Sequence, residues 1–274
     1  MPGNRRAHSA YAVAIGTGRH ALCRQLPEET AVALSYNGAT QAVMMATPAD
    51  LEDFALGFSL TEGLASPTEI DRVEHVETPE GIDLRIWLHS EAGARVAERR
   101  RSMTGPVGCG LCGIDSLAEA MRPPGVLPET GLRLGVAQVL EAVAALPQKQ
   151  PLHDATRAVH AAGFFVPGQG LVAVREDVGR HNALDKLAGA LLRADQPAGQ
   201  GAVVLTSRVS IDMVQKCVRL GAPVLIAVSA PTASALDLAD RAGLCVVALA
   251  RPERFEIFTH PHRITDPEGA ADVA

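Results

Sequence analysis

Short apolar segments next to turn residues, and one segment in which apolar and mostly polar residues alternate, predict strands in the first third of the chain. Apolar positions within residues 31–36 and 41–45 flank Asn37-Gly38, a dipeptide that favours a tight hairpin turn. The alternation of apolar and mostly polar residues from Ile82 to Leu88 predicts a further strand, as part of a second hairpin.

Two helices are predicted beside these strands. The first opens with Thr47 as its N-cap and Pro48 at the first helical position, and Gly63 closes it. Its apolar face is formed by Leu51, Phe54, Ala55 and Phe58. The second is a basic segment over residues 91–101.

The pattern changes in the second half of the chain. Apolar spacing from Val136 to Val143 predicts an amphipathic helix that stops at Pro147, and residues 163–174 have the pattern of a strand, a turn and a strand. Three short apolar runs follow, separated by helical segments, at residues 202–206, 224–228 and 244–249. Apolar strands that alternate with helices indicate a parallel sheet covered on both faces.

These elements predict an α/β protein with two domains. Residues 1–20 are expected to form a loose tail, residues 21–125 a small α+β domain, and residues 126–274 an α/β domain. The break is placed at Pro123-Pro124-Gly125, because such a cluster interrupts regular structure. With 47% hydrophobic and 20% charged residues, the chain has the composition of a globular protein.

The strand ends of the second domain are candidate binding loops. Ligands of open parallel sheets bind beyond the carboxyl ends of the strands, where this chain places residues 207–208, 229–232 and 251–254. Hydroxyls, helix N-termini and guanidinium groups suit an anionic, phosphate-bearing ligand. Helix capping and ordinary loop polarity explain the first two loops equally well, whereas Arg251 and Arg254 favour binding at the third.

Charge and cysteine content narrow the function. A net charge of −6 disfavours binding to duplex nucleic acid through a basic face. Five cysteines are too few and odd in number for a disulfide scaffold, and they are typical of a reducing cytoplasm. No run of about 18 apolar residues is present, so no membrane-spanning helix is predicted.

Cys109 and Cys112 are the candidate reactive residues. They lie two residues apart in a glycine-rich loop over residues 106–113, so both sulfurs can serve one metal, one disulfide or one transferred sulfur atom. Residues 99–101, all arginine, precede the loop, and a short helix is predicted to begin near Asp115. Cationic neighbours and a helix N-terminus both favour the thiolate, which is the reactive form of cysteine.

A metal centre fits this pattern poorly. Structural zinc needs four ligands, and the other three cysteines are isolated, with Cys217 and Cys245 predicted to be core residues. A deaminase zinc site needs His-x-Glu at a helix start, but His75-Val76-Glu77 lies in a strand-like segment. A sulfur carrier needs a mobile, accessible thiolate that takes up sulfur as a persulfide, and a second cysteine can resolve that persulfide.

Residues 175–186 form the densest polar cluster of the second half. They are predicted to cross from a strand end into a helix, where His181 and Asp185 are one turn apart and placed to share a hydrogen bond. A solvated helix face and a functional or dimer-interface role both remain open. His153 and His160 are predicted to be structural and not metal ligands.

Four motifs resemble the FdhD family of sulfurtransferases, in order and across nearly the whole chain after the tail. They are Gly108-Cys109-Gly110-Leu111-Cys112-Gly113, Glu176-Asp177-Val178-Gly179-Arg180-His181-Asn182-Ala183, Met213-Val214-Gln215-Lys216 and Val228-Ser229-Ala230-Pro231-Thr232. The resemblance implies a three-layer α/β/α second domain with a cytidine deaminase-like fold, without its zinc, in a cytoplasmic homodimer. Arg175 departs from the histidine that the family often has, and residues 156–162 lack the usual glycine.

The resemblance also implies a function. FdhD proteins accept sulfur from a cysteine desulfurase and deliver it to the molybdenum bis(molybdopterin guanine dinucleotide) cofactor that formate dehydrogenase needs. By match to the family motif, Cys109 would carry the persulfide and Cys112 would assist. The cofactor is a bound substrate, for which a guanine nucleotide is a mimic, and its binding loop maps onto Leu249, Ala250, Arg251, Pro252, Glu253 and Arg254.

The expectation is therefore a sulfurtransferase that binds no metal through its own side chains and has no nucleic acid or membrane partner. Two other functions stay open. One is a non-catalytic chaperone that binds the cofactor and a molybdoenzyme, and the other is a zinc-dependent, deaminase-like hydrolase.

Overall fold

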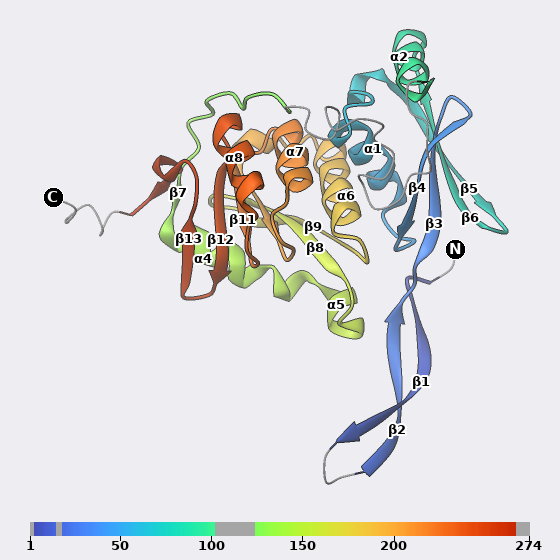
Figure 1. The fold of residues 1–274 in the computed structure, drawn as a ribbon, viewed down its shortest axis with the longest axis horizontal. Coiled ribbons are helices and arrows are strands. Elements are labelled where there is room, and N and C mark those ends of the chain that lie inside the picture. Colours follow the sequence, from blue (N-terminus) through green and yellow to red (C-terminus); the bar gives the residue numbers. More distant parts are fainter. Residues whose placement is uncertain (1–2, 15–17, 102–123, 267–274) are drawn as a thin grey trace.

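The computed structural model describes residues 3–14, 18–101 and 124–266 of the 274-residue chain, which form two lobes and a projecting ribbon (Figure 1). No helix within these ranges is long and apolar enough to cross a membrane.

The ribbon, called the arm below, is built from β1 (Arg5–Ala14) and β2 (Gly18–Pro27). The two strands pair antiparallel along their whole length, from Arg5 opposite Pro27 to Ala14 opposite Gly18. The prediction of a loose tail is therefore wrong for residues 5–14 and 18–20, which belong to these strands. The arm is rich in alanine and arginine on both faces, so its sequence lacks the alternation that marks a half-buried strand.

A four-stranded sheet with strand order β4-β3-β6-β5 forms the first lobe. Its strands are β3 (Thr30–Tyr36), β4 (Ala39–Ala46), β5 (Ile70–Thr78) and β6 (Gly81–Leu88). Both predicted hairpins are confirmed, and β3 and β6 run parallel between them. Alternate residues of β6 are buried in one core with α1 (Leu51–Thr61) and α2 (Ser90–Arg101).

Helix α1 begins later than predicted. Its first residue is Leu51, and Asp50 before it adopts the left-handed conformation with φ of 51°. The predicted roles of Thr47 as N-cap and Pro48 as first helical residue are therefore wrong. The amide and hydroxyl of Thr47 are instead bonded to Asp177 and Val178 in the other lobe. Gly63, with φ of +64°, follows the end of the helix as predicted.

A six-stranded sheet with strand order β13-β12-β11-β10-β8-β9 forms the second lobe. Its strands are β8 (His160–Val166), β9 (Gly170–Asp177), β10 (Ala202–Leu205), β11 (Val224–Ala227), β12 (Cys245–Arg251) and β13 (Arg254–Ile257). The three predicted apolar strands run parallel as β10, β11 and β12, and antiparallel strands flank them on both sides, so the sheet is mixed.

Helices cover both faces of this sheet (Figure 1). One core joins the sheet to α6 (Arg180–Arg193), α7 (Ile211–Leu220) and α8 (Ala233–Ala242). The core on the opposite face contains α4 (Val136–Ala145), and the short α5 (Pro151–Thr156) follows it. A two-stranded parallel sheet of β7 (Leu134–Gly135) and β14 (Ile264–Thr265) completes the lobe. The predicted α/β/α layering is confirmed, while the boundary near residue 125 and the likeness to deaminases stay predictions.

Candidate functional site

Cys109 and Cys112, with the helix predicted near Asp115, lie outside the described residues. Their roles therefore stay predictions. The three other cysteines are described: Cys217 and Cys245 are buried in the core as predicted, and Cys23 is exposed on the arm. Burial raises the pKa of the Cys217 and Cys245 thiols to about 12, so neither forms a thiolate readily at neutral pH.

The three predicted binding loops lie side by side at the carboxyl edge of the parallel strands. The amide of Thr232 donates to the Val209 carbonyl at 3.0 Å, and the amide of Val209 donates to the Ala230 carbonyl at 3.2 Å. The amide of Leu249 donates to the Ser229 carbonyl at 3.2 Å. These backbone bonds join the loops into one continuous edge, as expected for the ends of neighbouring parallel strands.

Two hydroxyl groups of this edge, those of Ser207 and Thr232, have structural partners. Ser207 is 3% exposed, and its hydroxyl donates to the carbonyl of Arg208. The hydroxyl of Thr232 accepts a bond from the amide of Ala235 and caps helix α8. The sequence left both helix capping and ligand binding open for this loop, and helix capping explains Thr232.

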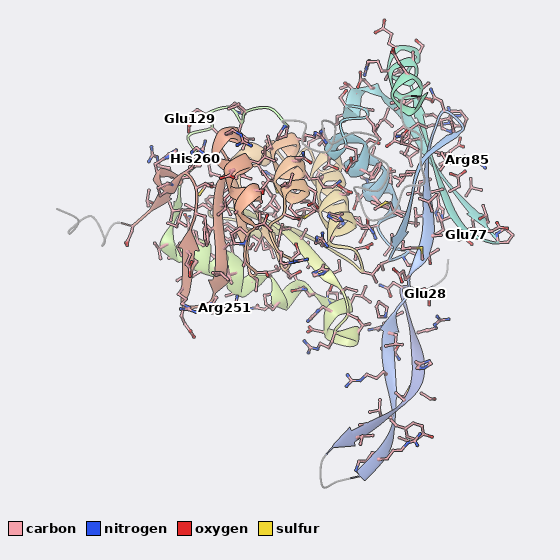
Figure 2. The ribbon with its side chains drawn as sticks, in the orientation of Figure 1. Glu28, Glu77, Arg85, Glu129, Arg251 and His260 are labelled. Carbon is pink, nitrogen blue, oxygen red and sulfur yellow. The ribbon has the colours of Figure 1, made fainter. Side chains whose placement is uncertain are left out.

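The arginine-bearing loop is the turn that links β12 to β13. Leu249 adopts φ of 52°, and the register of the two strands shifts between Ala248 and Arg251. Arg251 is exposed at the end of the sheet (Figure 2), and its Nη1 donates to the carbonyls of Val228 and Ala250. The exposed side chain of Arg254 makes no hydrogen bond or ion pair with any described residue. The turn therefore presents one anchored and one unengaged guanidinium group.

The N-termini of α6 and α7 meet at the same edge through His181 and Asp212. Nε2 of His181 contacts Oδ2 of Asp212 directly, and the two side chains are only 12% and 13% exposed. Burial alone would raise the pKa of Asp212, but the hydrogen bond and charge of His181 outweigh it and hold that pKa well below its usual range. The predicted bond between His181 and Asp185 is wrong, because Asp185 faces α1 and α7 from a different side of α6.

His160 lies close to this pair. Its Nδ1 is 3.4 Å from the hydroxyl of Thr206, which also accepts a bond from the amide of Ala161. Burial lowers the pKa of His160, and the nearby charges of Arg180 and His181 lower it further. The carboxyl edge thus combines two imidazoles and a carboxylate that the linear sequence did not bring together.

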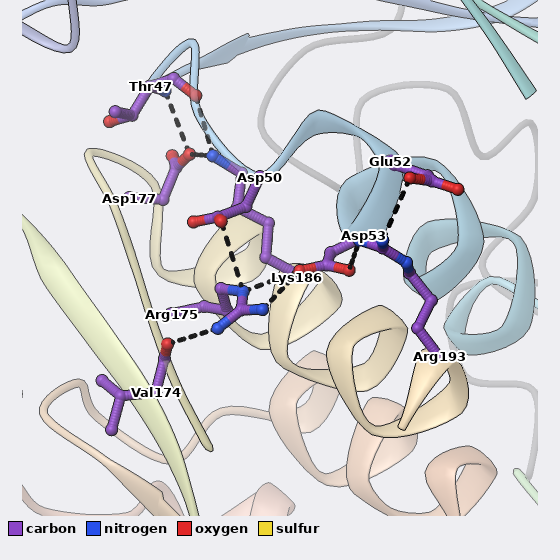
Figure 3. Close-up of polar contacts among 9 residues, drawn as sticks. All are labelled: Thr47, Asp50, Glu52, Asp53, Val174, Arg175, Asp177, Lys186 and Arg193. Carbon is purple, nitrogen blue, oxygen red and sulfur yellow. Dashed lines mark hydrogen bonds and ion pairs between the residues drawn. The ribbon is translucent and has the colours of Figure 1, made fainter. Parts of the chain in front are cut away.

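The rest of the polar cluster forms a buried seam between the two lobes (Figure 3). Lys186 and Asp177 have no exposed side-chain surface and form an ion pair at 2.6 Å. The amide of Thr47 donates to Asp177 at 3.0 Å, and Lys186 donates to the carbonyl of Thr47 at 2.8 Å. Asn182 donates both to Asp177 and to the carbonyl of Met45. This part of the cluster therefore fixes the second lobe against the end of β4.

A second buried ion pair extends the seam along α1. Lys216 bonds to Asp185 at 2.8 Å and to Glu62 at 2.6 Å, and the hydroxyl of Thr61 donates to Asp185. Although burial by itself lowers the pKa of Lys216, the two carboxylates more than compensate and raise it. Lys216 belongs to the third motif of the resemblance, and its role in the described structure is to join α7 to α1.

Helices α1 and α6 cross at very short range within this seam. A Cβ atom on Gly57 would overlap the carbonyl of Asp185, and one on Gly189 would overlap the backbone of Asp53. Arg175 on β9 bonds to Asp53 on α1 at 2.7 Å, beside this crossing (Figure 3). The arginine at position 175 therefore has an inter-lobe ion-pairing role here.

Within residues 3–14, 18–101 and 124–266, no group of three or more His, Cys, Asp or Glu side chains has the geometry of a metal site. His75 and Glu77, the residues of the deaminase-like triplet, lie on strand β5, as the sequence predicted.

Comparison with known proteins relates nearly the whole chain to one family. Residues 27–265 match the FdhD/NarQ family. The chain is 54% identical over 242 residues to the sulfur carrier protein FdhD of Agrobacterium fabrum, covering 88% of this chain and 89% of that protein. It is 48% identical over 250 residues to the sulfur carrier protein FdhD of Xanthomonas campestris pv. campestris, covering 90% and 88%. A crystal structure from Desulfotalea psychrophila, assigned as a formate dehydrogenase accessory protein, superimposes with a TM-score of 0.73 at 27% identity, over 95% of this chain and 99% of that one.

Proposed function

Because this chain belongs to the FdhD/NarQ family, we propose that it is a sulfur carrier that supports the activity of a formate dehydrogenase. The observation that carries the proposal is 54% identity, over 88% of the chain, to a protein named sulfur carrier protein FdhD. The glycine-flanked pair Cys109 and Cys112 supplies the chemistry that sulfur carriage requires.

Uptake of sulfur is a thiol–disulfide type of exchange. The thiolate of Cys109 attacks the outer sulfur of a persulfide on a cysteine desulfurase, so one S–S bond forms as another breaks and the desulfurase thiolate leaves. Attack of Cys112 on the inner sulfur then forms a Cys109–Cys112 disulfide and releases sulfide. The two electrons that convert the carried sulfur to sulfide come from the sulfurs of Cys109 and Cys112. A cellular thiol then reduces the disulfide and restores the two free cysteines.

The proposed acceptor is the molybdenum bis(molybdopterin guanine dinucleotide) cofactor, bound as a substrate at the turn between β12 and β13. Its phosphates carry the negative charge that guanidinium groups bind most readily. Arg254 is exposed and unengaged by the described residues, and Arg251 is held in place by two carbonyls, so the turn fits a diphosphate. The proposed setting is a cytoplasmic homodimer that acts as a sulfurtransferase.

Maturation of formate dehydrogenase in cells tests this proposal. A bacterial strain that lacks its own carrier would be complemented with the wild type, Cys109→Ala, Cys112→Ala or the matched control Cys23→Ala, whose cysteine is exposed on the arm. We expect formate-oxidising activity with the wild type and the control, and its loss with either loop variant.

Two other outcomes would redirect the proposal. Activity that survives both loop substitutions but is lost with Arg251→Ala and Arg254→Ala would indicate a cofactor-binding chaperone. Near-stoichiometric zinc in the purified protein would indicate a hydrolase.

A further inference from the structure

The arm is a two-stranded ribbon whose base lies close to α5 and whose far end projects away from both lobes (Figure 1). Each of its strands is ten residues long, which corresponds to about 33 Å. Of the β2 residues, only Leu22 and Pro27 are partly shielded from solvent, and the others are exposed. A hairpin that is covered on neither face is only marginally stable in water, so the arm has the structure of a segment that packs against another molecule.

The charge of the arm is opposite to that of the rest of the chain. Residues 1–27 contain Arg5, Arg6, Arg19 and Arg24, two histidines, and no aspartate or glutamate. The rest of the chain keeps 21 basic and all 31 acidic residues, which is a net charge of −10. Such a separation of charge favours association of the arm with an acidic surface.

An acidic hollow lies near the base of the arm. It is lined by the exposed carboxylates of Glu29, Glu77 and Glu80 and by Met45, whose surface is 51% exposed. Figure 2 shows Glu28 at the base of the arm and Glu77 on the neighbouring β5–β6 hairpin. Only two residues separate β2 from β3, so the far end of the arm points away from the hollow of its own chain.

A second copy of the chain offers both an acidic surface for the basic arm and a basic arm for the acidic hollow. When two arms lie antiparallel, the end of each arm that carries Arg19 reaches the base of the other, where the acidic hollow lies. The contact is reciprocal, as in a two-fold symmetric dimer, and it can also pair the open strand edges of the arms. A nucleic acid fits less well, because the charge of −10 on the rest of the chain repels it.

We propose that the arm is a dimerisation element whose Arg19-bearing end binds the hollow of Glu29, Glu77 and Glu80 on a second copy. The arm lies almost entirely outside residues 27–265, the part that matches the family, so this inference does not depend on sulfur carriage. Loss of dimerisation and loss of sulfur loading are also measured separately, by mass in solution and by covalent modification.

Sedimentation velocity on the full chain, at several protein concentrations and at low and high salt, tests the proposal. We expect a dimer for the wild type that weakens as salt rises. Arg19→Glu replaces an attraction by a repulsion at two symmetric contacts, so the dimer dissociation constant should rise at least tenfold. The matched control Arg241→Glu, at another exposed arginine on the second lobe, should leave it unchanged.

Charge exchange identifies the partner surface. Glu29→Lys with Glu80→Lys should also weaken the dimer, and combining these changes with Arg19→Glu should restore it. Circular dichroism melting of each variant checks that the fold is kept. A monomeric wild type, equal dimerisation of Arg19→Glu and the wild type, or no restoration in the combined variant would each overturn the proposal. Binding of the monomeric wild type to an oligonucleotide would overturn it in favour of a nucleic acid partner.

Discussion

Lys186 and Asp177 form an ion pair at 2.6 Å with no exposed surface on either side chain, and both also bond to the backbone of Thr47 in the other lobe. Lys186→Met removes one charge and leaves the other buried without compensation. We expect this substitution to lower the free energy of unfolding by about 3–5 kcal/mol. Urea unfolding followed by circular dichroism measures it, with Arg157→Met, at a surface arginine, as the control. A loss as small as that of the control would contradict the role of the pair as the inter-lobe joint.

Acid should weaken the contact between His181 and Asp212. The pKa of Asp212 is lowered in the folded state, so its contribution to stability is complete above the unfolded pKa of about 3.9 and is lost as pH falls through the folded value. The difference in unfolding free energy between the wild type and Asp212→Asn should therefore shrink as the pH falls from about 5 to about 2.5. Urea titrations across this range measure the difference. A difference that does not change with pH would count against the pairing.

The described cysteines should differ sharply in reactivity. Cys23 is exposed, whereas Cys217 and Cys245 are buried and have thiol pKa values raised to about 12. Iodoacetamide at pH 7.5 should label Cys23 in the native protein, and should label the two buried thiols only after unfolding. Peptide mass spectrometry reads each site. Native labelling of Cys217 at the rate of Cys23 would show that α7 does not protect it as described.

Arg254 should contribute to binding of a guanine nucleotide. Arg254→Ala removes a charge-assisted contact to phosphate, which corresponds to about 1.5–3 kcal/mol, or on the order of 10- to 150-fold in affinity. Calorimetric titration with guanosine diphosphate measures this change, with Arg241→Ala as the control for a distant exposed arginine. Unchanged affinity would remove the turn between β12 and β13 from the proposed cofactor site.

Local pattern was sufficient for much of the fold. The alternation from Ile82 to Leu88 predicted β6 correctly, and the apolar runs predicted β10, β11 and β12, because burial on one or both faces leaves a direct mark on the sequence. The carboxyl-edge loops were predicted to lie together because they follow the carboxyl ends of these parallel strands. The arm was missed because it buries almost no surface within the described chain.

Long-range polar contacts could not be predicted. Thr47 has the spacing of a helix cap, but its hydroxyl and amide are bonded to residues about 130 positions later in the chain. Helical spacing also allowed His181 to pair with Asp185, whereas its partner is Asp212 on the next helix. Sequence spacing shows which side chains share a helix face, and only the packing of helices shows what that face meets.

The most direct test of sulfur carriage is the intact mass of the protein after incubation with a cysteine desulfurase and cysteine. We predict that the wild type and Cys23→Ala each gain one sulfur atom, which dithiothreitol removes, and that Cys109→Ala gains none. A Cys109→Ala protein that still acquires a labile sulfur on residues 106–113 would contradict the assignment of Cys109 as the carrier.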